Sequence, residues 1–267
     1  MKVHHLDCGT MHPFGVPRKD GSGGFLVRGD GVVRCLLVET GEGPVLVDTG
    51  WGVRDFQQPS RAVRFFMDFC GCARDPELAA VRQVARLGYN PSDVRHIFLT
   101  HMHLDHAGGL PDFPDARVHL AAPELEAILH PRNPMEWFAY RPEHWAHGPR
   151  WEPHPITGNR WFGLEASPTV RIGGVEFVLV PFTGHTRGHC AVAVRTPEGW
   201  LLHCGDGYVY EPQVGVDQPY AYPYSSGPLV EALITGGLTI PHRHWATLRK
   251  LKMEHGDEVR MFCSHAP

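Results

Sequence analysis

A dense group of metal-ligating side chains lies near the middle of the chain, in the segment His101-Met-His103-Leu-Asp105-His106. Imidazole nitrogens and carboxylate oxygens are ligands for zinc, iron and manganese in proteins. The alternation of the chain turns His101 and His103 one way, while the following turn directs Asp105 and His106 another. The four side chains therefore cannot all reach one ion. The segment predicts two neighbouring metal ions, with a histidine-rich surface turn as the alternative.

Three more candidate ligands, each beside an expected strand, extend this pattern. His189 ends the segment Gly-His-Thr-Arg-Gly-His just before a strand, Asp206 follows a strand, and His265 ends the last strand. One such residue alone is more often a structural side chain with satisfied hydrogen bonds than a ligand. Three residues that repeat one pattern favour a shared metal site. His185, four residues before His189, is a candidate for a supporting role.

The elements expected around these residues are mostly strands with an apolar pattern. They cover residues 32–39, 44–48, 95–99, 117–121, 175–180, 191–195, 200–203 and 259–263, and helices are expected at 60–72, 76–87 and 242–255. The strand at 95–99 runs directly into His101, so the ligands fall in a loop at the C-terminal end of a strand, where α/β sheets place their sites. We expect one layered α/β domain over residues 1–267. The segment at about 123–165, rich in proline and aromatic residues, is expected to be an insertion or lid.

Composition narrows the class of protein. The 267 residues carry 19 histidines and a net charge of −4, and 42% of them are hydrophobic, which is typical of a globular protein and of neither a disordered nor a fibrous one. The mild acidity favours neither nucleic acid nor an anionic membrane as a partner. The N-terminal residues lack the apolar core of a signal peptide and no apolar run is long enough to span a bilayer, so we expect a cytoplasmic protein.

The seven cysteines are odd in number and form no CxxC pair. Buried reduced thiols are therefore expected rather than a disulfide framework. The pair Cys70-Gly-Cys72 remains an alternative site for a soft metal ion.

The order of the candidate ligands, with Asp48-Thr-Gly50 upstream, resembles the metallo-β-lactamase superfamily over nearly the whole chain. The resemblance implies a four-layer αββα sandwich with two divalent metal ions, zinc being favoured and iron or manganese being alternatives. It implies that Asp206 bridges the two ions and that Asp48 is a structural acid that orients the ligand loop. It also assigns three ligands to each ion: His101, His103 and His189 to one, and Asp105, His106 and His265 to the other.

Within this superfamily the layout is similar to that of the N-acyl-homoserine lactonases. About a hundred residues precede the histidine-rich segment. The sequence also resembles those enzymes in three segments, residues 35–40, 43–50 and 87–93. Lactonases of this kind have a tyrosine shortly after the bridging aspartate. Here Tyr208 and Tyr210 are near Asp206, but neither has the family's spacing.

The resulting hypothesis is a dinuclear hydrolase in which a hydroxide that bridges the metals opens a lactone or cleaves a related ester. Asp105 would pass a proton to the leaving group, and Tyr208 would stabilise the oxyanion. The expected substrate is a small molecule with an apolar portion, and a homodimer is left open. Alternatives are thioester, phosphodiester or β-lactam hydrolysis, an iron-dependent oxygenase with the same ligands, and a metal-stabilised binding protein without turnover.

Overall fold

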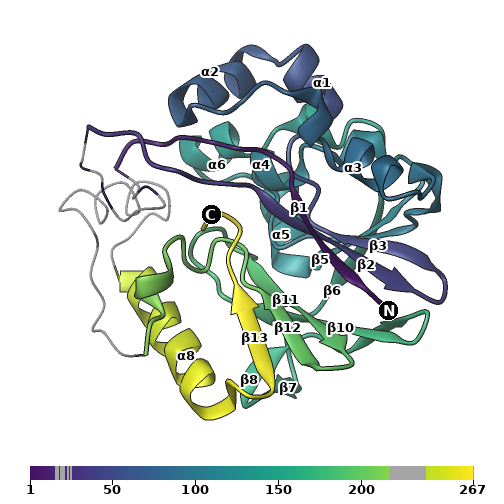
Figure 1. The fold of residues 1–267 in the computed structure, drawn as a ribbon, viewed down its shortest axis with the longest axis vertical. Helices are drawn as coiled ribbons and strands as arrows, with labels where there is room; N and C mark the ends of the chain where they lie inside the picture. The colour runs from purple at the N-terminus through teal and green to yellow at the C-terminus, as the bar shows by residue number, and fades with distance from the viewer. Residues whose placement is uncertain (16–17, 19–21, 23, 25, 217–238, 267) are drawn as a thin grey trace.

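Two facing β-sheets with helices on their outer faces form the computed structural model, which describes residues 1–15, 18, 22, 24, 26–216 and 239–266 (Figure 1). The first sheet has six strands in the order β1 (Val3–Asp7), β2 (Arg34–Thr40), β3 (Gly43–Val47), β4 (His96–Phe98), β5 (Arg117–Ala121) and β6 (Arg150–His154). The second has five strands in the order β13 (Val259–Phe262), β12 (Gly199–His203), β11 (Cys190–Thr196), β10 (Val175–Pro181) and β9 (Val170–Ile172). A separate hairpin joins β7 (Asn159–Trp161) to β8 (Leu164–Ala166).

Helices cover the outer faces of both sheets. Along the first half of the chain they are α1 (Val53–Gln57), α2 (Arg61–Cys70), α3 (Ala80–Arg86), α4 (Leu104–Ala107), α5 (Ala122–Leu129) and α6 (Pro134–Ala139). On the opposite side of the molecule α8 (Thr239–His255) lies against the second sheet (Figure 1). Short 3₁₀ turns are η1 (Pro76–Leu78), η2 (Pro91–Asp93), η3 (Leu110–Asp112), η4 (Pro142–His144) and η5 (Glu211–Gln213).

Three apolar layers separate these four structural layers, because successive side chains of a strand point to opposite faces. In β2, Leu37 packs under the helices of the first half and Leu36 packs between the sheets. Phe98 of β4 stacks on Phe177 of β10 with ring centroids 4.6 Å apart, which joins the sheets. Val178 faces the other way, into the cluster under α8. The fold is the expected αββα sandwich.

The principal strands match the predicted ones within two residues at each end, and the helix predicted at 76–87 shows the main local difference. Ala79 has an extended backbone, with φ −56° and ψ 137°, and divides the segment into η1 and α3. The predicted signals at its ends are confirmed. Asp75 accepts a hydrogen bond from the amide of Glu77 at 3.0 Å, and Gly88 has a positive φ of 90° after the last turn.

The segment at 123–165 takes part in the main fold. It contains α5 and α6, and β6 extends the first sheet by pairing in parallel with β5. The turn η4 is tied to the first half of the chain, since His144 lies 3.1 Å from Asp55 and the hydroxyl of Ser60 donates to Glu143 at 2.8 Å. The turn η4 is therefore held against α1 and the start of α2.

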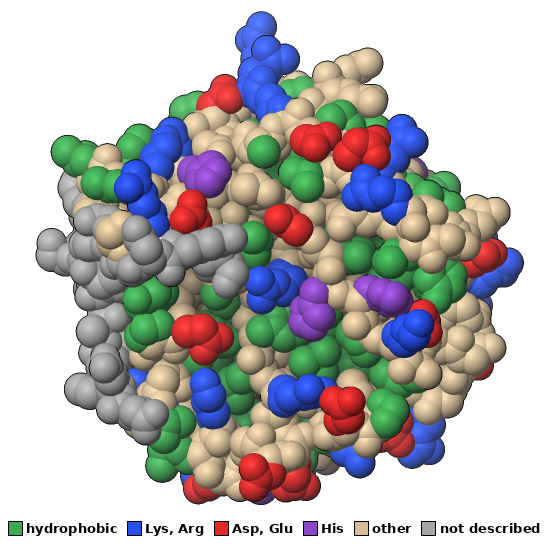
Figure 2. Space-filling view, in the orientation of Figure 1, with side chains coloured by type: hydrophobic (Ala, Val, Ile, Leu, Met, Phe, Trp, Pro, Cys, Tyr) green, Lys and Arg blue, Asp and Glu red, His purple; other side chains and the backbone are tan. Residues whose placement is uncertain are grey.

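Further expectations concern thiols, membranes and surface charge. The seven cysteines are free, and six of them are buried. Within the described ranges, no helix has the length and apolarity needed to cross a bilayer. On the face drawn in Figure 2, basic and acidic side chains are interspersed, so this face presents no extended field of one sign.

Candidate metal centre

The predicted polar residues meet where strands of both sheets end. From the first sheet come the residues after β3 and β4 and the short helix α4, and from the second come the β10–β11 loop and the residues after β12 and β13. These segments supply, in chain order, Asp48, His101, His103, Asp105, His106, His185, Asp206 and His265. The side chains of Asp48, His101, Asp105 and His106 are buried and the other four are partly buried, so their polar atoms face one another more than they face water.

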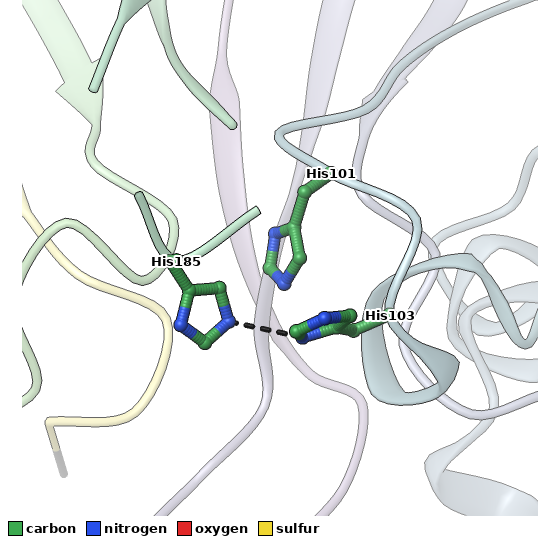
Figure 3. A group of neighbouring side chains, drawn as sticks. All are labelled: His101, His103 and His185. Atoms are coloured by element: carbon green, nitrogen blue, oxygen red, sulfur yellow. Dashed lines mark hydrogen bonds between the residues drawn. The ribbon is translucent and has the colours of Figure 1, made fainter. Parts of the chain in front are cut away.

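Three imidazoles form the first group, and Figure 3 shows them pointing toward one another from two loops. The ligand atoms of His101, His103 and His185 all lie within 4.8 Å of one another. Nε2 of His185 is 3.0 Å from Nδ1 of His103 and 3.1 Å from Oδ2 of Asp206. Such a cluster of nitrogens beside a carboxylate is a ligand set for one divalent ion.

The second group combines Asp105, His106 and His265. Nε2 of His265 lies 3.6 Å from Oδ2 of Asp105, and Nε2 of His106 lies 3.9 Å from its Oδ1. Asp206 stands between the groups, with Oδ1 at 3.3 Å from His106 and 3.1 Å from His265. Because its other oxygen faces His185, this carboxylate can contact an ion in each group.

The polar atoms at the centre fit divalent cations. Nε2 of His101, Nε2 of His106 and Oδ1 of Asp206 are buried and have no hydrogen-bond partner. An unsatisfied buried polar atom costs about 1–3 kcal/mol, which metal coordination would offset. The donors are imidazole nitrogens and carboxylate oxygens, the set preferred by zinc and also accepted by iron and manganese.

Hydrogen bonds to the opposite ring nitrogens orient these imidazoles. Nδ1 of His106 donates to Asp48 at 2.9 Å, and Nδ1 of His265 donates to the carbonyl of Val32 at 2.8 Å. With the proton on Nδ1, the lone pair of Nε2 faces the centre. His101 is held in the same way by the hydroxyl of Thr100 at 3.0 Å.

Asp48 has the structural role that the family resemblance implies. It is fully buried and accepts hydrogen bonds from both the amide and the hydroxyl of Thr100, each at 2.8 Å. Its φ of 56° is in the left-handed region, which aspartate tolerates better than most residues. One carboxylate thus fixes the start of the histidine-rich loop and the ring of His106.

The charges of the centre also favour cations. Burial lowers the pKa of His101 and His103 well below the usual range, so both rings are neutral. Burial also opposes charge on His106, but the carboxylates of Asp206 and Asp105 raise its pKa well above the usual value. Despite its own burial, Asp206 has a pKa well below the usual range because His265 and His106 face it. The negative potential that holds protons here also favours a divalent ion.

The structure does not bring His189 into either group. Its Nδ1 donates to the carbonyl of Phe182 at 3.1 Å, and its Nε2 accepts the amide N–H of Asp206 at 3.0 Å. Both ring nitrogens therefore have backbone partners. The position beside His101 and His103 that the sequence analysis gave to His189 is taken by His185.

Tyr208 also lies apart from the ligand atoms. It is fully buried in the apolar cluster that contains Trp245 of α8, and its hydroxyl donates to Glu211 at 3.0 Å. The predicted oxyanion role requires the hydroxyl to face the centre, and this contact directs it to Glu211 instead. For Tyr210, the backbone amide donates to Gln213. Tyr140 lies beside the first group, with its ring centroid 5.8 Å from that of His103.

Glu124 is a buried acid beside the centre that the sequence analysis missed. One carboxylate oxygen accepts the amide of Met102 at 2.8 Å, and the other accepts the hydroxyl of Thr186 at 2.7 Å and the amide of Gly188 at 3.0 Å. Burial raises the pKa of Glu124, against the lowering effect of these donors. Its position in the first turn of α5 resembles that of an ordinary exposed helix acid, so the sequence held no signal for it.

Comparisons with known proteins find a family and relatives that this chain resembles. The profile of the metallo-beta-lactamase superfamily matches residues 28–265. A probable metallo-hydrolase of Mycobacterium tuberculosis is 38% identical over 267 residues, which cover 100% of this chain and 81% of that protein. An N-acyl homoserine lactonase of Bacillus thuringiensis is 35% identical over 174 residues, which cover 62% of this chain and 59% of the lactonase.

Solved structures show the same fold. An N-acyl homoserine lactone hydrolase with its product N-hexanoyl-L-homoserine bound at the catalytic metal centre aligns with a TM-score of 0.67, covering 99% of this chain and 93% of that one at 22% identity. A dizinc quorum-quenching lactonase, AidC, aligns with a TM-score of 0.64, covering 99% of this chain and 87% of that one at 19% identity.

Proposed function

We propose that this chain, which belongs to the metallo-beta-lactamase superfamily and is a metal-dependent hydrolase, binds two divalent ions. With these ions it would open a lactone or cleave a related carboxylic ester. The observation that carries this proposal is the buried carboxylate of Asp206, which faces one ligand group with each of its oxygens. The similarity to the Bacillus thuringiensis lactonase supports the choice of a lactone or ester.

Each ion would have its own ligands, with zinc as the favoured metal. His101, His103 and His185 would hold one ion, while Asp105, His106 and His265 would hold the other, and Asp206 would contact both. When bound, such ions lower the pKa of a water molecule toward neutrality and polarise a carbonyl.

Asp105 is the residue best placed to move a proton. Its two oxygens lie 3.9 Å from Nε2 of His106 and 3.6 Å from Nε2 of His265. An oxygen not engaged by an ion can take the proton of the attacking water and return it to the alkoxide that leaves. No cysteine or serine nucleophile is required for this sequence of steps.

Exposed aromatic rings support a substrate with an apolar portion. Phe65 and Phe69 of α2 are 62% and 60% exposed, Trp137 of α6 is 60% exposed, and Phe138 packs edge-on against Phe65. The helix α6 is followed by Tyr140, whose ring centroid lies 5.8 Å from that of His103. The exposed rings of α6 are thus joined through the chain to a residue beside the first ligand group, and an acyl chain attached to a lactone could lie along them.

Metal analysis combined with a panel of substrates tests the proposal. The panel contains acylated lactones of increasing chain length, aryl esters, thioesters, phosphodiesters and β-lactams, and oxygen consumption is recorded in parallel. We expect about two metal ions per chain and a kcat/KM for lactones or aryl esters at least about 100-fold above that for the other classes. The exposed His147 provides the control variant His147→Ala, which should keep both metals and activity. Preferred phosphodiester cleavage, or oxygen uptake coupled to turnover, would contradict the proposal.

A further inference from the structure

Glu124 makes three hydrogen bonds to the two loops that carry the first ligand group. We propose that Glu124 is a positioning residue that holds His101, His103 and His185 in the geometry needed to bind the first ion, and that it acts on this group selectively. The inference rests on the proposed two-ion site and adds a residue to which no ligand or catalytic role is assigned.

The contacts of Glu124 reach both loops of the first group. Met102, whose amide donates to the carboxylate at 2.8 Å, lies between His101 and His103 in the chain. Thr186 and Gly188, which donate to the other oxygen at 2.7 and 3.0 Å, follow His185. One rigid carboxylate therefore sets the distance between two loops that come from different sheets.

The approach of the second loop to Glu124 is unusually close. A Cβ atom at Gly188 would lie 2.1 Å from the amide nitrogen of Glu124 and 2.5 Å from its Cα, so only glycine fits. The side chain of Glu124 is fully buried, which excludes water as a substitute partner for the three donors. Loss of an oxygen here would leave buried donors unsatisfied within three residues of His101, His103 or His185.

The second group has a different support. Asp48 binds the ring of His106 at 2.9 Å, and the carbonyl of Val32 binds the ring of His265 at 2.8 Å. None of the hydrogen bonds described for Glu124 goes to Asp105, His106 or His265. Removing the Glu124 contacts should therefore lower the affinity for the first ion much more than the affinity for the second.

Glutamine at position 124 is the informative substitution. It keeps the size of the side chain, but it replaces one oxygen by an NH₂ group that must face either the amide of Met102 or the donors of Thr186 and Gly188. Thr186→Val removes one donor without changing the volume much, and Thr186→Ser restores it. Glu126→Gln, at an exposed position of the same helix, is the matched control.

The experiment measures metal ions per chain and the visible spectrum of the Co²⁺-loaded protein after dialysis against a graded chelator. We expect Glu124→Gln and Thr186→Val to lower the affinity for one of the two ions by about 10–100-fold. Thr186→Ser and Glu126→Gln should bind both ions as tightly as the parent does. Melting temperatures of the metal-free variants show whether a loss comes from failure to fold.

Two backgrounds identify which ion is lost. With His265→Ala, which removes a ligand of the second group, Glu124→Gln should abolish most of the remaining binding. With His103→Ala, which already removes the first ion, Glu124→Gln should change little. Equal losses in both backgrounds, or none in either, would overturn the inference. A parent chain that binds fewer than about two ions would instead contradict the proposed function.

Discussion

At the scale of residues, two histidines four positions apart in one motif have different roles. His185 directs Nε2 to His103 and Asp206, whereas His189 uses both ring nitrogens on the backbone of Phe182 and Asp206. Spacing alone could not separate them, because both follow a glycine in the same loop. The sequence could bring the other six predicted residues together, since each follows a strand or lies in or beside the α4 turn, and strand ends converge at one edge.

Alanine substitutions distinguish these two roles. His185→Ala should reduce the metal content from about two to about one ion per chain and lower kcat/KM by at least about 1,000-fold. His189→Ala should keep both ions after reconstitution but lower the free energy of unfolding by about 2 kcal/mol, because two backbone groups lose a buried partner. Metal analysis and urea unfolding measure these outcomes. Loss of an ion from His189→Ala, with none lost from His185→Ala, would reverse the assignment.

Asp48 allows a test in which the backbone is preserved. Asparagine also tolerates the φ of 56°, but in Asp48→Asn one of the oxygens that bind Thr100 and His106 becomes a donor. We expect the affinity for the second ion to fall about 10–100-fold. Titration with Zn²⁺ in competition with a chromophoric chelator measures it, and Asp257→Asn, at an exposed position, serves as control. Unchanged affinity in Asp48→Asn would mean that Asp48 does not support the ring of His106.

At the scale of elements, sequence patterns predicted the strands buried on both faces and the edge strand β13, and missed the edge strands β1, β6 and β9. β2, β3, β10 and β11 carry long apolar runs, because each lies between two apolar layers. The edge strands β1 and β6 contain polar residues and a proline, and only pairing with a neighbour defines them. Glu124 was missed for a related reason, since its partners are distant in sequence.

Three adjacent strands also carry a row of histidines that should make stability depend on pH. His119 of β5 lies between His96 of β4 and His154 of β6, with nitrogen–nitrogen distances of 2.9 Å on each side. Burial, and then the neighbouring His154 and His96, lower the pKa of His119 to about 3. Below pH 6.5 the unfolded chain takes up a proton that the folded chain does not. The stability from neutral His119 is therefore present above pH 6.5 and is lost as the pH falls toward 3.

Replacing His119 removes this effect. The parent should lose up to about 1.4 kcal/mol of unfolding free energy per pH unit below pH 6 from this residue, whereas His119→Phe should not. Urea unfolding of the metal-free proteins at pH 7, 6 and 5 measures the free energy of unfolding of each. The value for the variant should rise relative to that of the parent as the pH falls. His130→Phe, at an exposed histidine, should follow the parent. A constant difference across this pH range would show that His119 does not contribute.

At the scale of the whole molecule, each ligand group draws from both sheets. In the first group, His101 and His103 follow β4 of the first sheet, while His185 comes from the β10–β11 loop of the second. In the second group, His106 of α4 meets His265 after β13. Bound ions would therefore link the two halves of the sandwich at one end. Along the rest of the interface, apolar packing such as that of Phe98 on Phe177 joins the sheets.

Removal of metal should consequently destabilise the whole sandwich. An ion present at 1,000 times its dissociation constant adds about 4 kcal/mol to the free energy of unfolding, which for a chain of this size raises Tm by about 8–16 °C. We expect a chelator to lower Tm by at least this amount and Zn²⁺ to restore it, with all spectroscopic probes changing together because both sheets lose the link. The double variant His103→Ala/His265→Ala, which lacks a ligand in each group, should melt at the same low temperature with or without the chelator. If the chelator abolished activity in the parent without lowering Tm, the ions would be bound by one half of the molecule only.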